Sequence, residues 1–158
     1  MVSGGIHLST QFFKKKLSMR KNIKLFDPVI SKEEEEEIIT ILKSGYWASG
    51  SGKGLVEKFE NVFNKFVHAK KSIAVNSGTA ALHLALSNLN IKNKEVILPS
   101  LSFVSTAHAI IYNQGIPVFA DIENETLCID AKKIKEKISS KTKAIIPVHF
   151  AGLPSDLN

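Results

Sequence analysis

Between residues 72 and 148, short apolar runs alternate with segments of helical length. The expected strands cover 73–75, 96–98, 118–120 and 144–148, and helices are expected at 78–89, 103–112 and from Asp130 through Ile138. Strands that alternate with helices over short connections are typical of a parallel sheet covered on both faces. The sequence therefore predicts an α/β fold, a three-layer α/β/α arrangement around a mainly parallel sheet. Four short strands are few for such a sheet, and residues 152–158 read as the start of a further unit, so we expect a sheet that is incomplete at the carboxyl terminus.

Two more helices are expected upstream of this region. Ser31 and Glu34 have the spacing of a capping box, the acids at 33–37 favour a helix start, and Gly45 ends the helix. The run of glutamates is interpreted as a solvated helix face. After a glycine-rich loop at 45–54, apolar residues at spacings of three and four from Leu55 to Phe66 predict the second helix.

The basic character of the chain is concentrated at its beginning. The formal net charge is +6, with 21 basic and 15 acidic residues, but residues 1–24 contain six basic residues and no acid. The remaining 15 basic residues equal the 15 acidic ones, so no specific nucleic-acid partner is indicated. We expect a basic, disordered leader at 1–24 and a body at 25–158. One hypothesis places the natural start at Met19; the alternative is a short disordered tail.

Cysteine content and hydropathy indicate the class of protein. Cys128 is the single cysteine, which excludes an internal disulfide and fits a reducing compartment. No run approaches the roughly 18 apolar residues of a membrane span. A cytoplasmic protein without a membrane partner is therefore expected.

The strongest local signal for binding is the segment Asn76-Ser77-Gly78-Thr79-Ala80, between an expected strand and an expected helix. Ser77 can cap the helix, Gly78 allows close backbone approach, and Thr79 adds a hydroxyl. Free amides and the positive dipole end of a helix form an anion site, for which phosphate is the natural ligand. The alternative is an ordinary helix cap that contains a glycine.

Other motifs give weaker signals. The loop at 45–54 does not fit a nucleotide-binding P-loop, because Gly54 follows Lys53 where Ser or Thr is required. The histidines lack metal-ligand spacing, and His83 and His108 are expected to be partly buried helix residues. His149 follows a strand end, where the sites of parallel sheets gather, so it remains a candidate for a functional role.

An ordered series of sequence blocks strongly resembles the DegT/DnrJ/StrS family of sugar-nucleotide aminotransferases, which are pyridoxal-phosphate enzymes of fold-type I. The resemblance covers roughly residues 25–158, the amino-terminal portion of such a protein. The blocks are Trp47-Ala48-Ser49-Gly50, Phe59-Glu60, Asn76 through Leu86, Glu95 through Ser100, Ser102 through Ala107, Pro117-Val118-Phe119 and Lys141 through His149.

This resemblance implies roles for individual residues. Ser77, Gly78 and Thr79 would hold the phosphate of pyridoxal 5'-phosphate, and the ring of Phe103 would stack on the pyridine ring. The segment with Trp47, Ser49 and Gly50 would lie near the substrate. The implied reaction moves an amino group, often from glutamate, to a nucleotide-linked keto-sugar, as in amino-sugar biosynthesis for surface polysaccharides. A homodimer is implied for a full-length protein.

The lysine that forms the Schiff base in this family has no match in the sequence. We therefore expect the 158-residue chain alone to be inactive, since transamination needs that amine. A non-catalytic remnant and a split subunit remain alternatives. A different fold-type I enzyme, such as a desulfurase or a lyase, is a third possibility, but the Phe103 block and the Pro147-Val148-His149 stretch favour the sugar aminotransferases.

Overall fold

The computed structural model describes residues 24, 27–47 and 54–157. The chain divides into two compact units, residues 1–57 and 58–158, which are described separately. In the first unit, helix α2 (Lys32–Ser44) begins with the expected capping box, in which the Ser31 amide donates to Glu34 Oε2 at 2.6 Å. It ends at Gly45, whose φ of 73° is a conformation that glycine adopts without strain. Both predicted ends of this helix are confirmed.

Helix α3 (Leu55–Val67) starts in the first unit and continues into the second. The second unit contains three more helices: α4 (Gly78–Ser87), α5 (Val104–Tyr112) and α6 (Ala131–Lys137). The Asp130 carboxylate caps α6 by accepting the Lys132 amide at 2.7 Å, as the sequence predicts. A short 3₁₀ turn, η1 (Phe150–Gly152), follows the last strand.

The sheet of the second unit has the order β2-β1-β3 and is entirely parallel in the described residues. Its strands are β1 (Glu95–Pro99), β2 (Ile116–Ala120) and β3 (Thr142–Ile145). Ile97 in the centre pairs with Val118 on one side and Ile145 on the other. Beyond β3, the Ile146 amide still donates to the Ile97 carbonyl at 2.8 Å. The ladder then stops, because Pro99 has no amide to donate to the Ile146 carbonyl.

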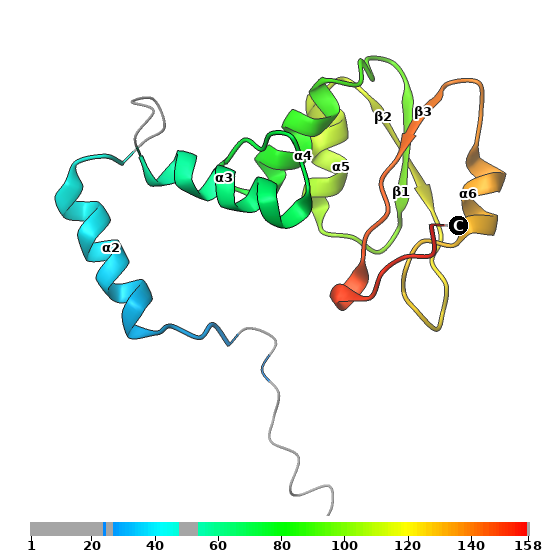
Figure 1. Cartoon of the computed structure of the whole chain (residues 1–158). Helices are drawn as coiled ribbons and strands as arrows, with labels where there is room; N and C mark the ends of the chain where they lie inside the picture. The colour runs from blue at the N-terminus through cyan, green and yellow to red at the C-terminus, as the bar shows by residue number, and fades with distance from the viewer. Residues whose placement is uncertain (1–23, 25–26, 48–53, 158) are drawn as a thin grey trace, which may run out of the picture. The chain divides into compact units, whose positions relative to one another are not determined.

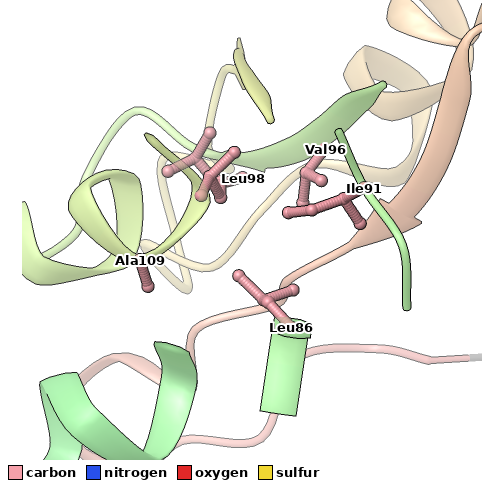
Figure 2. Close-up of a cluster of buried hydrophobic side chains, with 6 residues drawn as sticks. Leu86, Ile91, Val96, Leu98 and Ala109 are labelled. Carbon is pink, nitrogen blue, oxygen red and sulfur yellow. The ribbon is translucent and has the colours of Figure 1, made fainter. Parts of the chain in front are cut away.

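Helices cover both faces of this sheet (Figure 1). Helices α4 and α5 lie on one face, where Val96 and Leu98 of β1 pack with Leu86 and Ile110. Figure 2 shows Leu86 of α4 pointing toward Val96. Ile97 alternates to the opposite face and packs with Ala120 and Ile129, a cluster bordered by Ile134 of α6. The predicted α/β/α layers are therefore confirmed.

Two strand predictions need correction. Residues 73–75 form no strand, because no strand pairs with them in the described part of the chain. Apolar composition cannot supply that partner. The last strand covers Thr142–Ile145 rather than 144–148, because Pro99 of the neighbouring strand ends the ladder early. Among the described residues, no helix is long and apolar enough to cross a membrane.

Candidate functional site

The helix starts and strand ends of the second unit meet at one edge of the sheet. Helix α4 leads into β1 and α5 leads away from it, so both helices run opposite to the strand and pack side by side. The starts of α4 and α5 therefore lie toward the carboxyl ends of the strands, as Figure 1 shows for the two helices. In parallel sheets this edge is where ligands bind.

The turn at the start of α4 leaves two backbone amides without a helix partner. The Ser77 hydroxyl accepts the Ala80 amide at 3.2 Å, and the Ser77 carbonyl accepts the Ala81 amide at 3.0 Å. The amides of Gly78 and Thr79 belong to the first turn and have no intrahelical acceptor. A Cβ placed on Gly78 would meet no atom within 4 Å. The arrangement fits an anion, because two donors without a helix partner stand at the positive end of the helix dipole, beside the exposed Gly78.

Phe103 is the residue immediately before α5, at the position that the sequence predicts for an aromatic platform. Its backbone is extended, with φ of −71° and ψ of 142°, and its carbonyl accepts the Thr106 amide at 3.0 Å. The ring is 77% exposed. A large apolar ring that packs against little of its own chain can cover a flat ligand without rearranging the core.

His149 lies beyond β3 at the same edge. The Ile146 amide bonds to the Ile97 carbonyl, so the chain that leads to His149 leaves the sheet beside β1. Its Nδ1 accepts the Ser155 amide at 3.0 Å, and the buried Ser155 hydroxyl donates to the Val148 carbonyl at 3.2 Å. These bonds fix His149 Nδ1 as an acceptor and tie the 149–155 turn to the end of the sheet.

The remaining predicted residues are not brought to this edge by any recorded contact. Trp47 belongs to the first unit, is exposed, and donates from Nε1 to the Leu42 carbonyl at 3.3 Å. Ser49 and Gly50 lie outside the described residues. His108 is half-buried as expected, but the expectation for His83 is wrong. His83 is exposed because only the Leu86 side of α4 faces the core, and its ring contacts Tyr112 with centroids 5.9 Å apart.

A shallow depression of about 440 Å³ lies over the loop that follows the carboxyl end of β2 and leads into α6. Three of the residues around it are the carboxylates Glu123, Glu125 and Asp130, with Lys132 as the basic member. An excess of negative charge disfavours a phosphate there. Within the described ranges, no group of three or more His, Cys, Asp or Glu side chains could hold a metal ion.

Sequence reasoning missed one set of contacts next to the α4 turn. Glu60 Oε1 of α3 accepts the Ala74 amide at 2.8 Å, and Asn64 Oδ1 accepts the Ser72 hydroxyl at 2.6 Å. Glu60 was visible only as part of a matched block. The spacing of four between Glu60 and Asn64 places them on one helix face, but it does not identify what that face contacts.

Comparisons with known proteins give one consistent result. Residues 28–158 match the model of the DegT/DnrJ/EryC1/StrS aminotransferase family. The chain is 47% identical over 132 residues to the spore coat polysaccharide biosynthesis protein SpsC of Bacillus subtilis, covering 83% of this chain and 33% of SpsC. It is 39% identical over 138 residues to GDP-perosamine synthase of Escherichia coli O157:H7, covering 87% of this chain and 37% of the relative. The chain thus spans about a third of the length of these curated relatives.

Solved structures show the same similarity. The crystal structure of NtdA from Bacillus subtilis with bound cofactor PMP (pyridoxamine phosphate) superposes with a TM-score of 0.73 at 34% sequence identity. The match covers 88% of this chain and 34% of that protein.

Proposed function

The chain belongs to the DegT/DnrJ/EryC1/StrS aminotransferase family, and we propose that it forms the phosphate-binding and ring-stacking part of a pyridoxal-phosphate-dependent sugar aminotransferase. The observation that carries this proposal is the start of α4, where the Gly78 and Thr79 amides have no helix partner and a Cβ on the exposed Gly78 would meet no atom within 4 Å. The α/β fold with a parallel sheet is that of the fold-type I aminotransferases. Pyridoxal phosphate, when bound, supplies a pyridine ring that acts as the electron sink of transamination.

Each proposed cofactor residue has a distinct task. Ser77 holds the cap, so that the Gly78 and Thr79 amides point in a fixed direction toward the phosphate. The Thr79 hydroxyl is a further donor to the same group. Phe103 covers one face of the ring and fixes its plane. Together they bind and orient the cofactor at the carboxyl edge of the sheet.

The proposed substrate is a nucleotide-linked keto-sugar, with glutamate as the proposed amino donor. Similarity to a GDP-perosamine synthase supports the nucleotide-linked class, and similarity to a spore coat polysaccharide protein supports a role in surface polysaccharide synthesis. Trp47, Ser49 and Gly50 remain the proposed substrate-binding residues. A homodimer is the proposed assembly of a full-length protein.

The 158-residue polypeptide alone is proposed to bind the cofactor without turning over. Three segments follow the carboxyl ends of the strands, at 100–103, 121–130 and 146–157, and none of them contains a lysine. The amine that transamination requires therefore has no candidate at this edge of the described structure. Turnover with glutamate and a keto-sugar nucleotide by this polypeptide would contradict that proposal.

The binding proposal is tested by titrating the ¹⁵N-labelled chain with pyridoxal phosphate, pyridoxal and inorganic phosphate. The expected result is that both phosphate-bearing compounds shift the amide resonances of Gly78 and Thr79, whereas pyridoxal does not. If pyridoxal phosphate leaves these resonances unchanged, or shifts the 122–132 loop instead, the proposed site is wrong.

A further inference from the structure

The chain reaches the proposed phosphate-binding turn through a segment, residues 72–75, that lacks strand partners in the described structure. Residues 72–75 have none of the ladder bonds that hold β1, β2 and β3 together. The polar contacts recorded for this segment come from α3: Glu60 Oε1 accepts the Ala74 amide, and Asn64 Oδ1 accepts the Ser72 hydroxyl. A helix side chain thus takes the place of a neighbouring strand.

The face of α3 that makes these contacts differs from the rest of the helix. Glu60 and Asn64 are half-buried and four residues apart, whereas Phe59, Val62 and Phe66 are exposed. A carboxylate that accepts a backbone amide at 2.8 Å forms a charge-assisted hydrogen bond, which is stronger than a neutral one. The Glu60 contact is therefore the stronger of the two.

A short stretch of backbone connects the Glu60–Ala74 contact to the turn at the start of α4. Ala74 is four residues from Gly78, and Ser77 still has extended angles, with φ of −163° and ψ of 155°. Only Val75 and Asn76 lie between Ala74 and Ser77, and the chain bends at Asn76 and Ser77 just before α4 begins. A displacement at Ala74 is therefore transmitted to Ser77 and to the amides that follow it.

We propose that Glu60, assisted by Asn64, is a positioning residue that sets the direction of the Gly78–Thr79 amides through the Ala74 amide. Glu60 has no direct contact with the ligand. This inference rests on the proposed function, because it assigns Glu60 to the same phosphate site. It extends that site to α3, a helix that contributes none of the cofactor-binding residues.

Amide hydrogen exchange of the ¹⁵N-labelled 158-residue chain tests the positioning role without cofactor. Glu60→Ala is expected to speed exchange of Ala74 about tenfold, which corresponds to the loss of one charge-assisted hydrogen bond. Exchange at Ala80 and Ala81, which bond to Ser77, is expected to rise with it. Glu60→Gln keeps an oxygen acceptor and should restore most of the protection. Glu57→Ala, an exposed acid on the same helix, is the matched control and should leave all three amides unchanged.

Ligand binding gives the second readout. Glu60→Ala should weaken binding of pyridoxal phosphate about fivefold, close to the effect of 1 kcal/mol, while any weak binding of pyridoxal stays the same. If Glu60→Ala does not fold by circular dichroism, Glu60→Gln and Asn64→Ala replace it, with smaller effects in the same direction. Faster exchange confined to Ala74, with Ala80, Ala81 and cofactor affinity unchanged, would overturn the inference. If the wild-type chain fails to prefer pyridoxal phosphate over pyridoxal, the proposed function is wrong, whereas the exchange result still decides the role of Glu60.

Discussion

Ser77 has two roles, one in the stability of α4 and one in the proposed anion site. Its hydroxyl accepts the Ala80 amide and caps α4, and it also aligns the two free amides next to it. Ser77→Ala should therefore lower the free energy of unfolding by about 1 kcal/mol, the usual cost of losing such a cap. Urea denaturation followed by circular dichroism measures this. Ser87→Ala, at the other end of α4, removes a local bond to the Leu84 carbonyl and should cost less than about 0.5 kcal/mol. Equal losses for both variants would contradict the cap assignment.

Phe103 should affect binding but not stability. Because its ring is largely exposed, Phe103→Ala should change the free energy of unfolding by less than about 0.5 kcal/mol. Loss of an aromatic stack should weaken binding of pyridoxal phosphate roughly fivefold. Phe66→Ala on α3 removes another exposed ring and serves as the control, with cofactor affinity unchanged. A destabilised Phe103→Ala variant with normal affinity would show that the ring is structural.

At the scale of single residues, the roles that could be predicted from the sequence were those that depend on local neighbours. Ser77 as a cap, Asp130 as a cap and Phe103 at a helix start depend on neighbours within a few positions, so spacing and residue type reveal them. Glu60 could not be predicted from spacing, because its partner lies 14 residues away. The exposure of His83 was also missed, since it depends on which side of α4 meets the sheet.

In the turn between α5 and β2, Gly115 lies against buried side chains. A Cβ on Gly115 would lie 2.9 Å from both Ile110 Cγ2 and Ile91 Cδ1, side chains that are fully buried. Gly115→Ala should therefore destabilise the chain by about 1 to 3 kcal/mol, the range for overpacking a core. Thermal unfolding measures the change. Gly54→Ala, where a Cβ meets nothing within 4 Å, should change stability far less. Similar stability of both variants would show that the packing around Gly115 yields easily.

The stability of the first turn of helix α2 should depend on pH. A hydrogen bond with the Ser31 side chain holds the pKa of Glu33 below its ordinary value of 4.5. The folded helix therefore favours the ionised carboxylate, and its contribution is complete above pH 4.5 and lost as the pH falls through the lowered value. Amide resonances of the first turn, followed by NMR from pH 6 to pH 2, measure this. Glu33→Gln should remove that part of the pH dependence, whereas Glu37→Gln should leave it. An unchanged profile in Glu33→Gln would assign the effect to another acid.

Element types were easier to predict than strand partners. The helices of the second unit and the strands β1 and β2 were predicted because hydrophobic periodicity and punctuating residues report local structure directly. A strand, however, is defined by its neighbour. Residues 73–75 have a strand-like composition, yet Ala74 bonds to a helix carboxylate. The early end of β3 followed from Pro99 on the neighbouring strand, which becomes relevant only once the register is known.

At the scale of the whole chain, the sheet has two edges that no described strand covers, β2 and β3. Ile145 on β3 is exposed, as are Phe119 on β2 and Ile111 on α5. Open strand edges beside apolar side chains favour pairing between copies. The 158-residue polypeptide should therefore associate as its concentration rises and bind an apolar dye. Sedimentation velocity and dye fluorescence measure both effects.

Two substitutions on β3 distinguish association through the strand edge from non-specific hydrophobic association. Lys143 and Ile145 are both exposed and two residues apart, so they lie on the same face of the edge strand. Ile145→Lys adds a charge that disfavours edge pairing and should reduce association, whereas Lys143→Ile removes one and should increase it. Neither substitution touches the buried cluster, so stability should change little. One substitution adds a charge and the other removes one, two residues apart on the same strand. Opposite changes in association between copies would therefore identify this strand edge as the contact. Equal shifts, or none, would place the contact on another surface.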